Sequence, residues 1–178
     1  MAPRRLFPRL SPATQGTLRR FCTLLQHFLT CFVPDLGEME RNSNNLTIHS
    51  LPLADSEIAE VAAWLETQDA NFQCVENFQI CQNTAQLAKV CNTLVKEIMK
   101  NTEPSPSQNR VSAMKFDRPA VVPTQDGWIV DVIPVKVTEG SVKIADQPLA
   151  VGQYARLAKS VEVTGDFFAV LLLSELAK

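Results

Sequence analysis

The 178-residue sequence has few of the residues from which catalytic and metal centres are built. It contains two histidines, His27 and His49, and six glycines that stand apart from one another. Isolated glycines cannot form the Gly-rich loop that cradles phosphate groups. The cysteine spacings match no zinc-site pattern, and two histidines cannot complete a set of ligands. We therefore predict neither a metal centre nor a cofactor.

The five cysteines are odd in number, so they cannot all be paired in disulfides within the chain. Three of them fall within residues 72–100, which we expect to form one helix. Cys74 and Cys81 would then lie about 10 Å apart along the helix axis, farther than a disulfide can reach. Free thiols indicate an intracellular, reducing compartment. The cysteines are Cys22, Cys31, Cys74, Cys81 and Cys91.

The chain also lacks a long apolar run and a strong excess of either charge. Its densest apolar run, residues 21–33, includes Gln26 and His27 and is shorter than the roughly 20 residues of a membrane-spanning helix. The formal net charge is −2, and a mildly acidic protein is a poor partner for nucleic-acid phosphates. We predict no membrane span and find no strong nucleic-acid signal.

Residues 1–38 differ in composition from the rest of the chain. They contain five arginines and only two acids, Asp35 and Glu38. This pattern is typical of an organelle transit peptide, which would direct the protein to a mitochondrion or plastid. Two alternatives are an extension outside the folded body, with Met39 as the true start, and a helix docked on the domain by its Leu/Phe side. An RNA-associated organelle protein would depend on the arginines of residues 4–20 alone.

Two helices are expected in the first half of the folded body. Asp55 or Ser56 caps the first, in which Ile58, Val61 and Leu65 recur at the spacing of one buried face. The second runs from about Phe72 to Lys100 and carries a wide apolar stripe. Residues 101–109 contain two prolines and no apolar anchor, so they are interpreted as a linker.

The second half is rich in valine, isoleucine and aromatic residues between regularly spaced turn residues, which is typical of antiparallel strands. Residues 128–137 are the clearest strand. We expect hairpin turns at 138–141 and 164–166. Residues 167–173 are apolar on both faces and are interpreted as a covered central strand, with a terminal helix as the alternative.

These elements predict an α+β fold in which two helices from the N-terminal half pack on a small antiparallel β-sheet or barrel formed by the C-terminal half. The expected divisions are a segment of residues 1–38, a helical region of residues 39–101 and a β unit of residues 110–178. Residues 39–178 are expected to form one globular domain.

The only candidates for catalysis are carboxylates in or beside the β unit. A converging pair could act as general acid and base. Asp131 is the most distinctive, because an acid inside an apolar strand costs burial energy unless it is paired. The weak catalytic candidates are Asp131, Asp166 and Glu162, and Asp126 and Glu175 lie nearby in the sequence.

The missing catalytic sets favour a non-catalytic role in protein–protein interaction or assembly, with a protein partner or a second copy bound. Aromatic residues often anchor such contacts. The candidate partner-binding residues are Trp128, Tyr154 and Phe78, of which Trp128 and Tyr154 are expected to be exposed. The alternative is a small enzyme that uses the β-unit carboxylates on a phosphorylated or nucleotide substrate.

Overall fold

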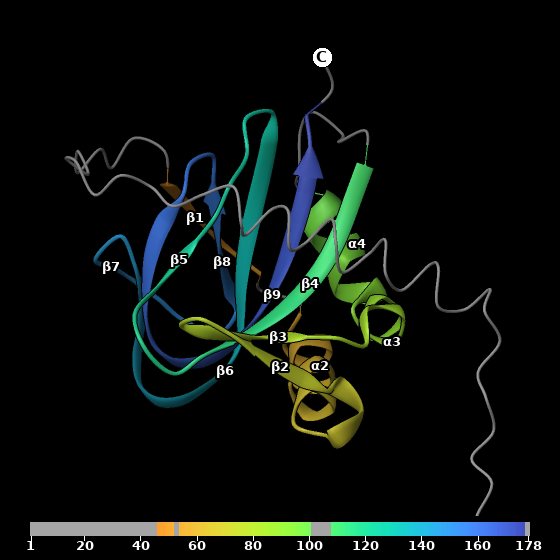
Figure 1. Cartoon of the computed structure of the whole chain (residues 1–178). Helices are drawn as coiled ribbons and strands as arrows, with labels where there is room; N and C mark the ends of the chain where they lie inside the picture. Colours follow the sequence, from red (N-terminus) through yellow and green to blue (C-terminus); the bar gives the residue numbers. More distant parts are fainter. Residues whose placement is uncertain (1–45, 52–53, 101–107, 177–178) are drawn as a thin grey trace, which may run out of the picture. The chain divides into compact units, whose positions relative to one another are not determined.

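The computed structural model describes residues 46–51, 54–100 and 108–176. They belong to one compact unit, residues 42–178. Nine strands form one antiparallel sheet in this part of the chain, and its main path follows the order β1-β8-β6-β9-β4-β3-β2 (Figure 1). The strands are β1 (Leu46–Ser50), β2 (Phe72–Val75), β3 (Phe78–Cys81), β4 (Gln108–Phe116), β5 (Ala120–Val122), β6 (Trp128–Ile144), β7 (Gln147–Leu149), β8 (Gln153–Leu157) and β9 (Val161–Glu175).

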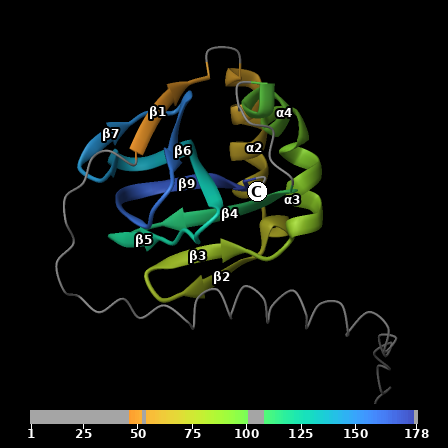
Figure 2. The ribbon, with the colours of Figure 1, turned by 90° about the horizontal axis from the view of Figure 1, so that it is seen from above.

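The two longest strands, β6 and β9, pair along most of their length and organise the sheet. The first part of β9 also pairs with β5, and its second part pairs with β4. The first part of β6 pairs with β8, and its end pairs with β7. Register shifts in β6 between Pro134 and Lys143 let the strand bend, because each extra residue disrupts the ladder locally and increases the twist. Both strands are strongly curved (Figure 2).

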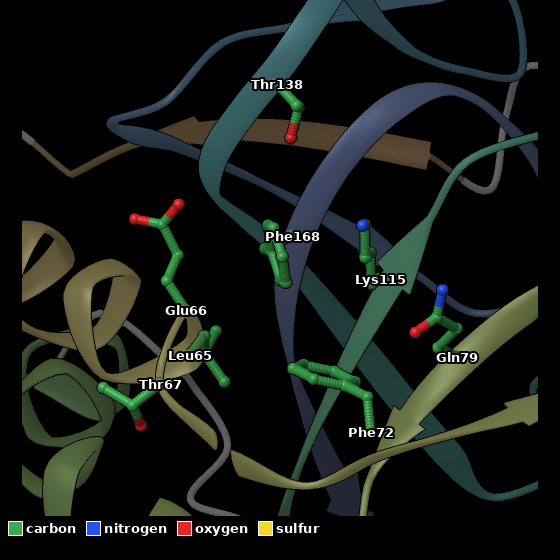
Figure 3. Close-up of a pocket in the computed structure, with 8 residues that line it drawn as sticks. All are labelled: Leu65, Glu66, Thr67, Phe72, Gln79, Lys115, Thr138 and Phe168. Carbon is green, nitrogen blue, oxygen red and sulfur yellow. The ribbon is translucent and has the colours of Figure 1, made fainter. Parts of the chain in front are cut away.

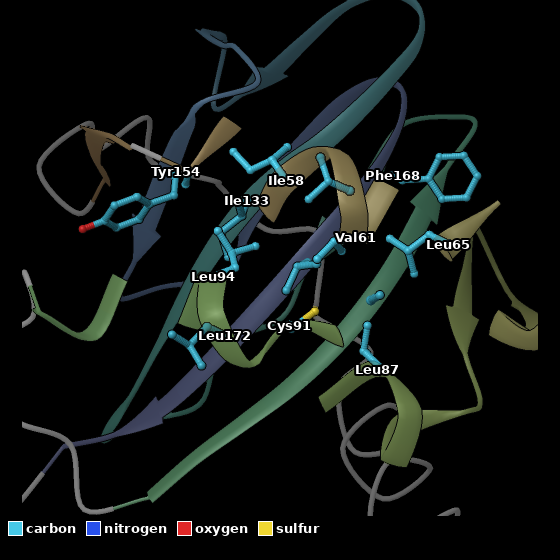
Figure 4. Packing of buried hydrophobic residues seen from close by; sticks show 14 of the residues in the cluster. Ile58, Val61, Leu65, Leu87, Cys91, Leu94, Ile133, Tyr154, Phe168 and Leu172 are labelled. Atoms are coloured by element: carbon cyan, nitrogen blue, oxygen red, sulfur yellow. The ribbon is translucent and has the colours of Figure 1, made fainter. Parts of the chain in front are cut away.

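Three helices cover one face of the sheet, which we call the helix face: α2 (Asp55–Leu65), α3 (Thr84–Val90) and α4 (Asn92–Lys100) (Figure 2). Their apolar residues pack against β4, β6 and β9 (Figure 4). We call this cluster of buried residues the helix-face core. Ile58, Val61 and Leu65 of α2 are fully buried there, and each contributes about 1.5–3 kcal/mol of hydrophobic stabilisation. The expected helix is present at residues 55–65, but its predicted cap is wrong, because the N-cap residue is Ala54 and no side chain caps the helix.

The opposite face, which we call the concave face, has its own set of buried apolar residues, separate from the helix-face core. Its residues alternate along each strand with those that contact the helices, so the curved sheet itself must cover them. The buried apolar residues outside the helix-face core are Phe78, Ile80, Met114, Phe116, Ala120, Val122, Val130, Val132, Val142, Ile144, Leu149, Ala155, Leu157, Val163, Phe167, Ala169 and Leu171.

The predicted architecture of two helices on a small C-terminal sheet is wrong. Strands hold 53% of the described residues and helices 25%, and three strands, β1 to β3, lie in the first half, of which β2 and β3 fall in the segment that was expected to be one helix. These three strands extend the sheet at both ends, because β1 pairs with β8 and β3 pairs with β4. The sheet is therefore the main body of the described unit, and the helices cover only one of its faces.

The single helix predicted for residues 72–100 is also wrong. Residues 72–81 form the hairpin β2–β3, which turns at Glu76 with a positive φ of 49°. Asn83 then begins α3, since its side chain accepts a hydrogen bond from the backbone N–H of Gln86 at 3.3 Å. Cys74 and Cys81 lie on paired strands and are free thiols, as is Cys91. Apolar residues three and four positions apart concealed the period of two in this hairpin.

The hairpin turns predicted at residues 138–141 and 164–166 do not exist, because β6 and β9 continue through both segments. Gly165 has a φ of +121°, and a Cβ placed there would lie 2.7 Å from the carbonyl oxygen of Ser141. A glycine is needed at this position for the close approach of the two strands, not for a turn. The real turn is at Ala145 and Asp146, whose positive φ values fit a two-residue hairpin between β6 and β7. Residues 167–173 do form a covered strand between β4 and β6, as predicted.

Candidate functional site

Aromatic side chains pack against one another on the concave face. Phe116 stacks on Phe167 at 4.8 Å between ring centroids, and Phe78 lies 6.1 Å from Phe116. The buried polar residue on this face is Ser112, which pairs with the buried Leu171. A small curved sheet whose interior is filled by side chains is a packed core.

The helix face carries a buried ion pair between Asp131 of β6 and Arg156 of β8. The Arg156 guanidinium donates from Nε to Oδ1 at 2.8 Å and from its second nitrogen to Oδ2 at 3.0 Å. The Asp131 side chain is 1% exposed, and that of Arg156 is 16% exposed. Hydrogen bonding to Asp131 raises the pKa of Arg156 above its ordinary value. Both carboxylate oxygens accept hydrogen bonds, so Asp131 acts as a structural anchor between the strands.

Tyr154 and His49 continue this polar row across β8 and β1. The Arg156 guanidinium lies 5.7 Å from the Tyr154 ring centroid, and the His49 ring stacks on Tyr154 at 4.8 Å. Burial raises the pKa of the Tyr154 hydroxyl. The His49 ring nitrogen Nε2 lies 3.1 Å from the hydroxyl of Thr47. No three His, Cys, Asp or Glu side chains of the described residues lie close enough to hold a metal ion.

The structure does not bring the other predicted catalytic residues together with Asp131. Asp131 pairs with Leu172 of β9, whereas Asp166 lies six residues away on that strand, about 20 Å at the usual rise of a strand. Glu162 is exposed and pairs with Val121 of β5. Asp126 precedes Trp128, which pairs with Glu175 near the other end of β9. The Oδ1 atom of Asp166 is buried without a hydrogen-bond partner.

The three predicted partner-binding aromatics have different environments. Tyr154 is 1% exposed and belongs to the helix-face core, so its expected exposure is wrong. Phe78 is 6% exposed and lies on the concave face. Trp128 is half-buried and is the first residue of β6, and the Arg110 guanidinium of β4 lies 5.4 Å from its ring centroid. Among these three side chains, Trp128 alone is placed to contact a partner.

An open hollow of about 340 Å³ lies on the helix face beyond the end of α2 (Figure 3). Its apolar surface comes from Leu65, Phe72 and Phe168, and the rings of Phe72 and Phe168 meet edge to face at 5.6 Å between centroids. Lys115 and Gln79 lie on neighbouring strands beside Phe168. Thr67, Glu66 and Thr138 complete the lining. Glu66 forms an ion pair with Lys136.

Sequence reasoning did not find this hollow. Lys115 lies between the buried residues Met114 and Phe116, and a lysine inside an apolar strand was the available signal. Its significance depends on pairing between distant segments, because Gln79, Lys115, Phe168 and Lys136 form one row across four strands. Such a row cannot be identified until the strand register is known.

Comparisons with known proteins show the fold and nothing more specific. No protein-family model matches the sequence, and the search of curated proteins finds no match. Among solved structures, the chain is similar to a prolyl-4-hydroxylase from Pseudomonas putida, with a TM-score of 0.51 and 10% identity. The likeness covers 76% of this chain and 95% of that chain. In the described part of this chain, no helix is long and apolar enough to cross a bilayer.

Proposed function

We propose that this protein is a non-catalytic protein-interaction module that binds its partner around Trp128. The observation that carries the proposal is the pairing of Trp128 with Arg110 at 5.4 Å, where the strands end and the sheet no longer buries them. Trp and Arg dominate the energetics of many protein interfaces. The half-buried Leu173 pairs with Arg110 on the intervening strand β9 and adds apolar surface beside them.

The described residues do not fit hydroxylase chemistry of the non-haem iron type. That chemistry requires two histidines and one carboxylate on one metal, with open positions for oxygen and substrate. The described residues include one histidine, His49, and no group of three potential ligands. A complete set would have to recruit His27, which lies outside the described residues. The likeness in fold therefore gives no reason to assign this chain the named activity of its structural neighbour.

The proposal is tested by photo-crosslinking of the full chain in its source cell. The variant Trp128→p-benzoylphenylalanine carries the crosslinker at the proposed site. The same substitution at Trp64 is the matched control, because Trp64 is also half-buried but contacts the helix-face core. We expect one dominant crosslinked protein from position 128 that is absent from position 64. A second copy of the chain as that protein would identify self-association.

A second substitution tests whether Arg110 contributes to the same contact. Arg110→Ala should reduce the crosslinked fraction at least about tenfold, equivalent to about 1.4 kcal/mol, while the thermal unfolding midpoint stays close to that of the wild type. Equal crosslinking from positions 64 and 128, or a sedimentation profile and crosslinking pattern unaffected by Arg110→Ala, would count against the proposal.

A further inference from the structure

We propose that the hollow beside the end of α2 binds a small carboxylate with an apolar body, of the size of an arylalkanoic acid. This inference goes beyond the interaction role, since the hollow lies on the helix face, whereas strand alternation places the Trp128 side chain on the opposite face of the sheet. The two proposals can therefore fail separately. Three features of the hollow favour such a ligand: its shape, its apolar side chains and the Lys115 ammonium.

The hollow is open to solvent, and three apolar side chains line part of it. Its volume of about 340 Å³ falls in the range of roughly 300–1,000 Å³ found for ligand pockets. Phe168 forms the floor and is 9% exposed, and Phe72 and Leu65 stand beside it (Figure 3). An aromatic ring or short alkyl chain placed over Phe168 would remove this apolar surface from water.

One side chain of the hollow, Lys115, favours an anion. Among the described residues, the Lys115 ammonium has no carboxylate partner. Its nitrogen lies 5.3 Å from the centroid of the Phe168 ring. The nearby acids are otherwise engaged, because Glu66 pairs with Lys136 and Asp117 pairs with Arg118. A half-buried ammonium without a counter-ion gains from a bound carboxylate, since charge-assisted hydrogen bonds are the stronger ones.

The position of Lys115 also fixes how such a ligand would lie. Because the ammonium lies 5.3 Å from the centroid of the Phe168 ring, a carboxylate bound to it would hold its apolar body beside the apolar residues of the hollow. The amide of Gln79, directly opposite Lys115 on β3, and the hydroxyl of Thr138 can donate further hydrogen bonds. A few placed donors around an apolar floor are the usual arrangement of a small-ligand site.

The test measures binding of 3-phenylpropionate to the full chain by isothermal titration and ligand-observed NMR. The uncharged 3-phenylpropionamide has the same body and isolates the contribution of the charge. Lys115→Met keeps the alkyl stem over Phe168 and removes the ammonium, and Lys89→Met is the matched control, because Lys89 is exposed on α3. We expect the acid to bind at least about tenfold more tightly than the amide. Lys115→Met should abolish that difference, whereas Lys89→Met should preserve it.

Three results would overturn the proposal: equal binding of acid and amide, an unchanged affinity in Lys115→Met, or a dissociation constant for the acid weaker than about 10 mM. A tripeptide that ends in phenylalanine tests the other source of the same chemistry, a protein C-terminus. Tighter binding of this tripeptide than of the free acid would also overturn the assignment to a small molecule. Trp128→Ala should leave the affinity for 3-phenylpropionate unchanged, whatever its effect on protein partners.

Discussion

Phe167 and Phe168 are neighbours in β9, yet their side chains enter different environments on the two faces of the sheet. Phe167 is 0% exposed and stacks on Phe116 in the filled concave face. Phe168 is 9% exposed and forms the floor of the open hollow on the helix face. Alternation along a strand sends successive side chains to opposite faces. One strand thus supplies both the packed interior and the candidate ligand site.

The polar chemistry of the two faces differs in the same way. The concave face buries one hydroxyl, that of Ser112, among apolar residues. The helix face carries the Asp131–Arg156 pair, the Lys136–Glu66 pair and Lys115. The Asp131–Arg156 pair is the buried one of these, and buried charges are costly unless they are paired. The two faces therefore differ mainly in the charged groups that they carry beside their apolar residues.

The largest effect is expected from removing the two phenylalanine rings one at a time. Phe167→Ala should reduce the free energy of unfolding by about 3–5 kcal/mol, the usual range for a fully buried phenylalanine. Phe168→Ala should cost clearly less, because the hollow already leaves part of its ring without packing partners. Urea unfolding of both variants measures the difference. Equal losses would show that the two faces are packed alike and would remove the contrast between them.

A smaller effect is expected from neutralising the two carboxylates that the sequence made most prominent. Asp131→Asn removes the charge that accepts both Arg156 hydrogen bonds, and should cost about 1.5–3 kcal/mol, as for hydrogen bonds to charged groups. Asp166→Asn is the matched control, because the buried Oδ1 of Asp166 has no hydrogen-bond partner to lose. That variant should change stability by no more than about 0.5 kcal/mol. Chemical denaturation of both proteins at one pH gives the comparison.

A reversed ranking of these two variants would mean that the ion pair contributes little and that the Asp166 carboxylate has a role the strand pairing does not reveal. The double variant Asp131→Val with Arg156→Met provides a further check. Replacing both partners of a buried pair by apolar residues is often close to neutral, so this double variant should be more stable than Asp131→Asn.

The sequence predicted best where local pattern and tertiary packing agree. The helix at residues 55–65 has apolar residues at a helical spacing and buries that same face. Residues 167–173 are apolar on both sides because helices cover one face and the curved sheet covers the other. The strand at residues 128–137 was also identified, although it continues to Ile144.

Prediction failed where the deciding interaction is between distant segments. The hairpin of residues 72–81 has a helix-like spacing of apolar residues, and its pairing with β4 determines that it is a strand pair. Gly165 looked like a turn residue, but the close approach of Ser141 explains the glycine. Asp131 was identified as unusual from its apolar neighbours, and its partner Arg156, 25 residues later, could not be deduced. The hollow was missed for the same reason, since five strands contribute to it.

The smallest expected effect is a pH dependence that arises in the helix-face core. Burial, and secondarily the neighbouring Cys81 thiol, raise the pKa of Cys91 from 9.0 to about 12. The folded protein therefore keeps the Cys91 proton at pH values where the unfolded chain has lost it. This contribution to stability is complete below about pH 9 and is lost as the pH rises toward 12, with a limiting slope of about 1.4 kcal/mol per pH unit.

Cys91→Ala isolates this contribution from the other groups that titrate in alkali. From pH 8 to pH 10, the wild-type free energy of unfolding should fall by about 1 kcal/mol more than that of Cys91→Ala, from the linkage slope, although the variant is less stable overall because a buried side chain is truncated. Cys74→Ala is the matched control, since Cys74 is exposed on β2, and it should follow the wild-type curve. Urea unfolding under reducing conditions gives the three slopes. Parallel curves for all three proteins would mean that water reaches Cys91, and that the core beneath the helices is less tightly closed than the concave face.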